Sequence, residues 1–399
     1  MRLGLGMVVA GACACCTPWM AAQERPASDA SAGEGRPDNI VAEFPVFTDG
    51  DLLLVPVEVA GRTYSFMVDT GFSTTTFDTR LSAALAMPAG RASRRVRVIG
   101  AGTMETATAR QFAIAGLPPF VARSVWRGDL TRIRESTGHE VMGIIGIDLL
   151  RDFVLHIDAD AGLLQIWKQA PESAEPAITV RWRRSGTPTI RTTLGGSVAD
   201  DLILDTGNFS LEPIVDLAQP LYQNLERRGA IKTLYAVATS RVDKFHEIRT
   251  GVLDELALQE GPTLNKIRAS EHPEGLNLLG LSALMQFSPT FDFPHDRLVL
   301  GPRKPGHAAS RFPVQGSGLA LLRRDGATFV HSVRRNSRAA VAGVRTGDVV
   351  EFAAAKVASD YRLHELRLLL ETTGPTVQLA VRADGGELRK ILLPRQDTD

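Results

Sequence analysis

The sequence predicts a mainly β protein in which two similar halves are followed by a smaller third domain. Short apolar runs of strand type, bounded by glycine turns, recur through residues 45–303, and the tripeptide Asp-Thr-Gly occurs twice in equivalent settings. A turn-rich linker then separates these halves from a segment with a different pattern. With 399 residues the chain is long enough for two or three domains.

The first residues are typical of an export signal. Arg2 precedes the apolar run 3–14, and small residues precede a plausible cleavage point after Ala22. The run is too short for a transmembrane helix, which needs about 20 apolar residues, and no later segment qualifies. We therefore expect residues 1–22 to be a signal peptide, and a soluble periplasmic or secreted protein without a membrane span.

All three cysteines lie inside this leader, so cleavage leaves a chain with neither disulfides nor thiols. An alternative is a lipoprotein, in which a cysteine is acylated after Ala12 or Ala14, although neither site has the usual leucine three residues upstream. Residues 23–40, rich in Ala, Ser, Gly and Pro, are predicted to be a disordered linker.

The charge balance argues against polyanionic partners. Lys plus Arg and Asp plus Glu number 45 each, so no net field favours nucleic acid or an anionic membrane surface. The arginine clusters at 91–97 and 181–184 are interpreted as solvated faces. Because the eight histidines are scattered and the mature chain lacks cysteine, we expect neither a metal nor another cofactor.

Two copies of Asp-Thr-Gly mark the two halves. The copies are Asp69-Thr70-Gly71 and Asp205-Thr206-Gly207. They end the apolar runs 64–68 and 201–204, and another strand with a glycine turn comes before each, at 52–61 and 189–196. A single copy is typical of an ordinary turn, whereas two copies in matching frames indicate a duplicated plan.

A second shared block follows each copy at nearly the same distance. The two blocks are Ile144-Ile145-Gly146 and Leu278-Leu279-Gly280. Gly146 follows Asp69 by 77 residues (146 − 69), and Gly280 follows Asp205 by 75 (280 − 205). The two halves therefore share one β-rich plan. We place the first half at 41–170 and the second at 171–303.

These motifs resemble the aspartic peptidases of the retropepsin and pepsin type, in which each lobe supplies one Asp-Thr-Gly turn and a later apolar-apolar-Gly segment. The resemblance covers about residues 45–303 and implies a bilobal, pseudo-symmetric acid-protease β-barrel fold that acts on polypeptide substrates. It implies that the catalytic pair is Asp69 and Asp205. The residues that it implies to support this pair are Thr70, Gly71, Thr206 and Gly207.

The chemistry of peptide hydrolysis explains why two carboxylates are needed. Attack by water requires one group to accept a proton and another to donate a proton to the carbonyl oxygen. Two adjacent aspartates share one proton, because like charges at short distance do not both ionise readily. Glycine-ended turns let the two backbones approach closely. The predicted activity is therefore that of an aspartic endopeptidase with water as the nucleophile.

The resemblance also implies a β-hairpin flap in each half. The first candidate runs from strand 95–99 through the tip Gly100-Ala101-Gly102 to strand 103–114. The second candidate, around 232–247, is less distinct, so we expect one dominant flap from the first half.

Two positions depart from the family pattern. The residue after Asp-Thr-Gly is usually Ser or Ala, and here it is Phe72 or Asn208. Asn208 retains a hydrogen-bond donor for the outer carboxylate oxygen, whereas Phe72 does not. An apolar neighbour raises the pKa of the pair by desolvation, so we expect an activity optimum shifted toward neutral pH. The alternative is a non-catalytic peptide-binding or scaffold protein that retains the peptidase fold.

Residues 312–395 form the predicted third domain. Strands are expected at 318–322, 328–333, 377–382 and 388–393, and helices at 338–344 and 360–372. Ala342-Gly343 and Gly347-Asp348, followed by two β-branched residues, resemble a PDZ domain of the bacterial periplasmic-protease kind.

This second resemblance implies a peptide-binding role. Such a domain adds an extended peptide as a strand, and backbone amides after a glycine turn capture a terminal carboxylate. The residues implied in this role are Gly318, Leu319, Ala320 and Leu321. The implied partners are peptide C-termini with apolar end residues, and the domain would recruit substrates or regulate access to the peptidase. The alternative is a PDZ fold that only packs against the peptidase.

Overall fold

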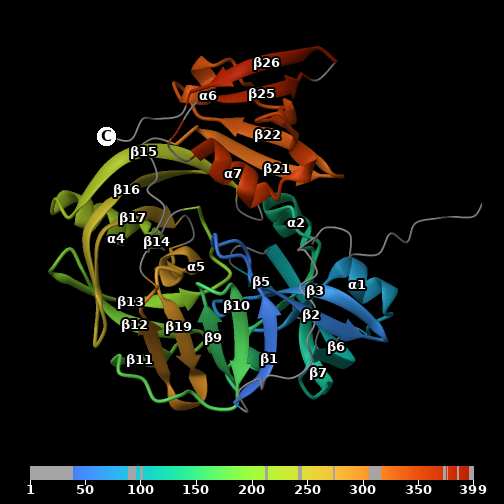
Figure 1. Cartoon of the computed structure of the whole chain (residues 1–399). Helices are drawn as coiled ribbons and strands as arrows, with labels where there is room; N and C mark the ends of the chain where they lie inside the picture. The colour runs from blue at the N-terminus through green and yellow to red at the C-terminus, as the bar shows by residue number, and fades with distance from the viewer. Residues whose placement is uncertain are drawn as a thin grey trace, which may run out of the picture. The chain divides into compact units, whose positions relative to one another are not determined.

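The protein, described here as a computed structural model, is built mainly from β-strands, as the sequence predicts (Figure 1). The structure describes residues 39–88, 96–98, 102–211, 214–240, 245–272, 275–304, 316–371, 374, 376–383 and 386–394. The predictions for residues 1–38 and for Gly100 and Ala101 therefore lie outside the described residues. Within the described residues, no helix has the length and apolar character needed to cross a membrane.

The first half contains a seven-stranded sheet with the order β2-β3-β8-β4-β7-β6-β5. Its strands are β2 (Leu54–Val59), β3 (Arg62–Val68), β4 (Thr76–Asp78), β5 (Val96–Val98), β6 (Gly102–Ile114), β7 (Phe120–Gly128) and β8 (Val141–Ile145). The helices are α1 (Thr79–Ala84), α2 (Thr131–Thr137) and α3 (Ile147–Leu150). Parallel pairing puts Val68 beside Ile145, so the first Asp-Thr-Gly turn begins next to its apolar-Gly segment.

The second half repeats these pairings. Its strands are β12 (Pro188–Leu194), β13 (Val198–Asp205), β14 (Ile214–Ala218), β15 (Ile231–Ser240), β16 (Phe245–Leu258), β17 (Thr263–His272) and β18 (Leu278–Gly280). The helices are α4 (Gln219–Arg227) and α5 (Leu281–Leu284). β13 is parallel to β18 as β3 is to β8, and β14 lies between β18 and β17 as β4 lies between β8 and β7. The sequence repeat is therefore a repeat of strand topology.

Six further strands join the two halves. They are β1 (Ile40–Pro45), β9 (Val154–Asp158), β10 (Leu163–Trp167), β11 (Ala177–Trp182), β19 (Ser288–Asp292) and β20 (Arg297–Gly301), with the 3-10 turn η2 (Phe293–His295) before β20. Their order is β1-β10-β9-β19-β20-β11, and the halves meet where β9 pairs with β19 (Figure 1). The sequence analysis did not anticipate β1, which begins at the last residue of the predicted linker. This shared hydrogen bonding fixes one half against the other.

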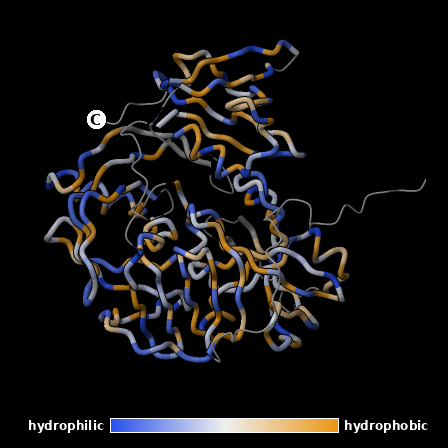
Figure 2. Tube along the Cα trace, viewed as in Figure 1, coloured by the Kyte–Doolittle hydropathy of each residue, from blue (hydrophilic) through white to orange (hydrophobic). Residues whose placement is uncertain are grey.

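The core of the peptidase-like part is one apolar cluster that extends through both halves. In the first half, Phe77 packs edge to face with Phe66 and with Phe112, at ring-centroid distances of 5.1 and 5.4 Å. Figure 2 shows apolar and polar residues interspersed along the strands, as expected where one face of a sheet is buried. Each fully buried large apolar side chain contributes about 1.5–3 kcal/mol, so this core holds the turns of the site in place.

The two hairpins predicted as flaps are described only in part. β5 and β6 pair only over Val96–Val98, whereas β15 and β16 pair along the whole of Ile231–Ser240. Residues 89–95 and 99–101 lie outside the described residues, so the dominance of the first flap stays a prediction. Segment 231–240 has no glycine or proline and is rich in β-branched residues, which favours a continuous strand.

The described part of the C-terminal module, residues 316–394, forms a separate six-stranded sheet around its own apolar cluster. Its strands are β21 (Leu319–Arg324), β22 (Ala327–Val333), β23 (Val349–Ala353), β24 (Lys356–Val357), β25 (Val377–Arg382) and β26 (Leu388–Leu393). The helical segments are α6 (Arg338–Val341), η3 (Ala358–Asp360) and α7 (Leu363–Glu371). The predicted strands and helices of this module are confirmed to within a few residues. β21 pairs with β22 alone, so it is an edge strand of this sheet.

Candidate active site

The two Asp-Thr-Gly turns exchange hydrogen bonds across the two halves. The Thr70 hydroxyl donates to the Leu204 carbonyl (2.8 Å) and accepts from the backbone N–H of Thr206 (3.1 Å). The Thr206 hydroxyl donates to the Val68 carbonyl (2.9 Å) and accepts from the backbone N–H of Thr70 (3.1 Å). Each hydroxyl therefore serves as donor and acceptor at once, which a threonine can do and an aliphatic side chain cannot.

The glycines of the turns bring the two carboxylates together. A Cβ atom on Gly71 would overlap the carboxylate of Asp205, and a Cβ atom on Gly207 would overlap the carboxylate of Asp69. Each aspartate thus lies against the opposite turn. Glycine is required here because of this close approach.

The carboxylates are oriented by backbone amides. Asp69 accepts from the N–H of Gly71 (2.9 Å), and Asp205 accepts from the N–H groups of Gly207 and Asn208 (both 3.0 Å). Asp69 is only 7% exposed. Its burial and the nearby charge of Asp205 raise its pKa well above 3.8, and the backbone hydrogen bonds oppose this shift only in part. The pair is therefore suited to share one proton.

The residue after each apolar-Gly segment bonds to the residue that follows the Asp-Thr-Gly turn of the same half. The carbonyl of Phe72 accepts from the N–H of Ile147, and the carbonyl of Asn208 accepts from the N–H of Leu281 (both 2.8 Å). A Cβ atom on the glycine before each donor would crowd that carbonyl. The recurrence of these two glycines in the sequence thus has a packing reason.

In the family pattern, the side chain at the positions of Phe72 and Asn208 can donate a hydrogen bond to the outer carboxylate oxygen. The side chains of Phe72 and Asn208 make other contacts instead. Phe72 is 9% exposed and packs edge to face on Trp126, with ring centroids 5.9 Å apart. It belongs to an apolar cluster with Leu52, Met67, Met104, Leu130, Val141 and Ile144. The side-chain amide of Asn208 donates to Asp216 (2.9 Å), a residue that the sequence analysis did not single out. The apolar environment beside Asp69 fits the raised pKa of that carboxyl.

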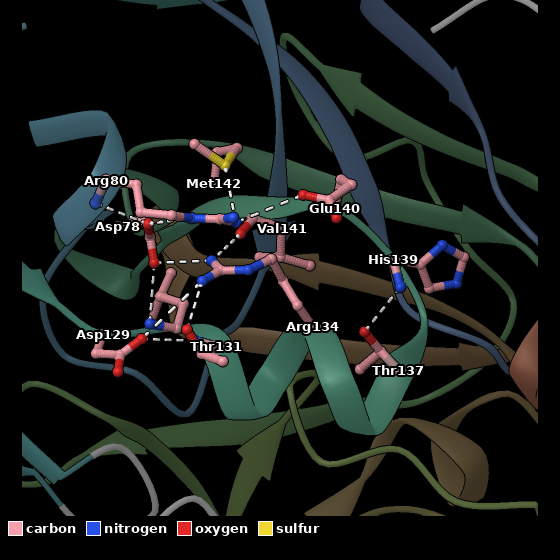
Figure 3. Close-up of polar contacts among 11 residues, drawn as sticks. Asp78, Arg80, Asp129, Thr131, Arg134, Thr137, His139, Glu140, Val141 and Met142 are labelled. Atoms are coloured by element: carbon pink, nitrogen blue, oxygen red, sulfur yellow. Dashed lines mark hydrogen bonds and ion pairs between the residues drawn. The ribbon is translucent and has the colours of Figure 1, made fainter. Parts of the chain in front are cut away.

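A buried ion pair joins β4 and α2 of the first half (Figure 3). Asp78 accepts from the Arg134 guanidinium (2.7 Å) and from the N–H of Leu130 (3.0 Å). Arg134 also donates to the carbonyl of Val141, the first residue of β8 (3.1 Å). Sequence reasoning missed this pair. The one available signal, an aspartate before α1, predicts only the N-cap hydrogen bond that the Asp78 carboxylate accepts from the N–H of Arg80.

The predicted flap and peptide-binding residues lie apart from the aspartates in the chain. Gly102 begins β6, and the rest of the first tip lies outside the described residues. Gly318 immediately precedes β21, and the other residues predicted to bind a peptide, Leu319, Ala320 and Leu321, open that strand. The segments of the chain that the structure describes hold no group of three or more His, Cys, Asp or Glu residues arranged for a metal ion.

Side chains of α7 contact the start of β21, which the sequence analysis did not anticipate. The Leu321 carbonyl accepts from Arg367 (2.6 Å), and the N–H of Ser317 donates to Glu371 (2.5 Å). Arg367 and Glu371 are four residues apart on α7 and therefore lie on one face of that helix. The helical periodicity predicts α7 itself but not what this polar face contacts.

Two aspartate turns joined by their threonines thus lie at equivalent places of a duplicated β topology. Residues 55–149, from β2 to α3, match a family model described as Aspartyl protease. This match supports an aspartic protease at the level of the family, and it includes the first Asp-Thr-Gly turn. No curated protein matches the chain.

Proposed function

We propose that this chain is an aspartic endopeptidase in which Asp69 and Asp205 activate a water molecule against a peptide carbonyl. The observation that carries the proposal is the reciprocal hydrogen bonding of Thr70 and Thr206. This exchange keeps each carboxylate against the opposite glycine, so that the two acids lie close enough to act on one peptide bond.

The two aspartates take different roles because their environments differ. We assign the shared proton to Asp69 at the start of the reaction, because Asp69 is buried whereas Asp205 is only partly buried. Asp205 accepts a proton from water as the water oxygen bonds to the carbonyl carbon, and Asp69 donates its proton to the carbonyl oxygen. Asp205 then protonates the leaving nitrogen as the C–N bond breaks, and a hydroxyl of the intermediate returns a proton to Asp69. The pair ends with one proton, as it began.

The raised pKa extends activity toward neutral pH. Because the pair must hold one proton, activity falls when that proton is lost, and the burial of Asp69 and the charge of Asp205 move this loss to higher pH. We expect the pH–rate profile for cleavage of an unfolded protein to peak well above pH 4. A maximum below about pH 3.5, near the value of an unperturbed aspartate, would contradict this expectation.

We further propose that the C-terminal module is a PDZ domain that recruits polypeptide substrates or regulates their access. The support is an edge strand, β21, with the amphipathic helix α7 beside it and a glycine turn at its start. An edge strand of this kind accepts a further strand through its backbone. We also propose that the leader exports the protein to the periplasm or the medium.

The test of the catalytic proposal is cleavage of casein by the purified protein across pH 3 to 8. Asp69→Asn and Asp205→Asn should each reduce cleavage by about three orders of magnitude or more. Each substitution removes one of the two carboxyl groups and keeps a side chain of the same shape, so the turn geometry is preserved. Asp201→Asn is a matched control, since this partly exposed residue lies on the same strand β13 and pairs with Arg191.

The outcomes separate the peptidase from a binding protein. Loss of cleavage in both dyad variants, with an active control and preserved folding, supports the proposal. If the folded parent cuts no protein substrate at any pH but still binds peptides, the alternative of a non-catalytic peptide-binding protein replaces it.

A further inference from the structure

The residue after the second Asp-Thr-Gly turn, Asn208, is held at three points. Its backbone N–H donates to the Asp205 carboxylate (3.0 Å), and its carbonyl accepts from the N–H of Leu281 (2.8 Å). Its side-chain amide donates to the carboxylate of Asp216 (2.9 Å). Because the backbone and the side chain of Asn208 are both anchored, the N–H that meets Asp205 is kept in one orientation.

Asp216 offers a fixed acceptor from a buried strand. It lies on β14 and is only 3% exposed. β14 is hydrogen-bonded to β17 on one side and to β18 on the other, where the register partners of Asp216 are Ser270 and Leu278. Arg268 and His272 share the face of β17 on which Ser270 lies, so they are the ionisable groups that this strand brings toward Asp216. The acceptor is thus built into the sheet of the second half.

The corresponding position of the first half carries a different side chain. Thr76 takes the place of Asp216 in the strand pairing, and its hydroxyl donates to the carbonyl of Thr74 (3.0 Å). The residue in the place of Asn208 is Phe72, which packs in an apolar cluster. The link between this strand and the turn therefore belongs to the second half, and the two acids of the pair have unlike surroundings.

The N–H of Asn208 matters most when Asp205 is ionised. A hydrogen bond from a backbone N–H to a carboxylate favours the charged form of that carboxylate. In the proposed reaction, Asp205 has to be charged to accept a proton from water. A loosened N–H would weaken this preference, and Asp205 would then compete with Asp69 for the shared proton.

We propose that Asp216 is a positioning residue for the aspartate pair: through the side-chain amide of Asn208, it holds the Asn208 N–H on the Asp205 carboxylate and so keeps Asp205 as the base. The inference deepens the proposed peptidase function and rests on it. Asp216 acts through Asn208 and not on the substrate itself.

The acidic side of the pH–rate profile tests this role. Casein cleavage falls at low pH as Asp205 takes up a proton, so the pH of half-maximal kcat on that side reports the ionisation of Asp205. Asp216→Val removes the acceptor and should move this pH up by about one unit, with a lower kcat and an unchanged KM. Asn208→Ala keeps the N–H and removes the amide, and it should move the pH in the same direction.

Further variants separate positioning from a general loss of stability. Asp216→Asn retains an acceptor oxygen for the Asn208 amide and should shift the profile less than Asp216→Val does. The double variant of Asp216→Val and Asn208→Ala should shift it no further than either single change, because both remove the same link. Asp292→Asn is the matched control. It alters a buried aspartate of β19 that pairs with Arg297 and His295, and it should lower stability without moving the profile.

A titration that needs no substrate gives the same information. In protein labelled with nitrogen-15 at asparagine, the backbone N–H signal of Asn208 is identified by its loss in Asn208→Ala. This signal should shift with pH as Asp205 ionises, and the midpoint should rise in Asp216→Val. If the parent cut no casein, the proposed peptidase function would fail, and this titration would still decide whether Asp216 acts on the pair.

Two results would overturn the proposal. The first is an unchanged acidic side and an unchanged midpoint in Asp216→Val, with only a smaller amount of active protein. The second is an equal shift in Asp292→Asn, because the shift would then follow from lost stability alone. If Asp216→Val does not fold, the acidic side of the profile of Asn208→Ala decides, since Asn208 is only partly buried.

Discussion

The threonine of each Asp-Thr-Gly turn completes the hydrogen bonding of the other turn. Loss of one hydroxyl therefore leaves two buried groups without a partner. For Thr70 these groups are the carbonyl of Leu204 and the N–H of Thr206. A substitution of one threonine therefore destabilises both turns.

Thr70→Val should reduce the free energy of unfolding by about 2–4 kcal/mol, because each unsatisfied buried group costs about 1–3 kcal/mol. It should also reduce casein cleavage, since the two carboxylates lose their fixed separation. Urea unfolding measures the first effect and initial rates the second. Thr70→Ser keeps the hydroxyl and should remain close to the parent. Equal stability of the valine and serine variants would show that the hydrogen bonds of the Thr70 hydroxyl do not contribute to the free energy of unfolding.

The raised pKa of Asp69 makes the folded protein less stable as this residue ionises. The folded-state pKa lies above the unfolded value, so the contribution of Asp69 is most favourable below about pH 3.8 and is lost as pH rises through the folded pKa. Each pKa unit of difference is worth about 1.4 kcal/mol.

Asp69→Asn should therefore raise the melting temperature at pH 7, because asparagine resembles the protonated acid. The gain should shrink toward pH 3.5, where the parent is also protonated. Thermal unfolding of the parent and the variant at both pH values measures this. Asp201→Asn, at a partly exposed residue of β13, should show no such gain. A lower melting temperature for Asp69→Asn at pH 7 would be inconsistent with a desolvated carboxylate.

At the scale of elements, the ion pair of Asp78 and Arg134 connects the N-cap of α1 with α2 and β8. Both side chains are buried, so neither charge has water as an alternative partner. Arg134 of α2 thus bonds both to the Asp78 side chain of β4 and to the first residue of β8. This arrangement stabilises the sheet that carries the Asp69 turn.

Arg134→Met should destabilise the protein by about 3–5 kcal/mol, because it leaves the Asp78 carboxylate buried without its cation. The double variant Asp78→Asn with Arg134→Met should be less destabilised than Arg134→Met alone, since no unpaired charge remains. Urea unfolding of the two single variants and the double variant gives the coupling energy. Additive losses would mean that the two residues do not interact.

At the scale of the whole molecule, the C-terminal module contacts the first half through charged groups. Arg362, next to α7, pairs with Asp51 (2.7 Å) and with Asp49, and its guanidinium lies over the Phe47 ring, 3.8 Å from the centroid. His364 bonds to the backbone carbonyl of Asp49 (2.9 Å). Asp51 is therefore held by residues far away in the sequence.

The protonation of Asp51 follows from these neighbours. Burial alone raises the pKa of Asp51, but the hydrogen bond and charge of His139, the charge of His364 and the N–H of Leu52 together lower it to about 2. Its contribution to stability is therefore present above the unfolded value of about 3.8 and is lost only as pH falls toward 2. The contact persists over the pH range in which we expect activity.

Arg362→Ala should loosen this contact and change the rate of cleavage. Leu52, which follows Asp51, packs in the same apolar cluster as Phe72, so the effect can reach the Asp69 turn. We expect faster amide hydrogen exchange in residues 46–53 and in α7, together with a lower kcat for casein. Arg335→Ala, an exposed arginine of the same module, is the matched control. Unchanged exchange in both segments would show that Arg362 does not hold the module.

The sequence predicted the parts of this protein that depend on local pattern and spacing. The strands that lead into Asp69 and Asp205 follow from apolar runs ended by glycine turns, and the duplicated plan follows from the spacing to Gly146 and Gly280. The second hairpin was less distinct in the sequence, because strand formation there depends on partner strands as well as on local composition.

Only the tertiary structure decided which distant groups meet. Asn208 was expected to face a catalytic carboxylate, and its amide instead reaches Asp216. Glu371 was one residue of a predicted helix, and it proves to fill the turn at Ser317, 54 positions earlier in the chain. A sequence records residue types and spacing along one chain. Hydrogen bonds and ion pairs between loops depend on how separate sheets pack, and packing is not encoded in any one local segment.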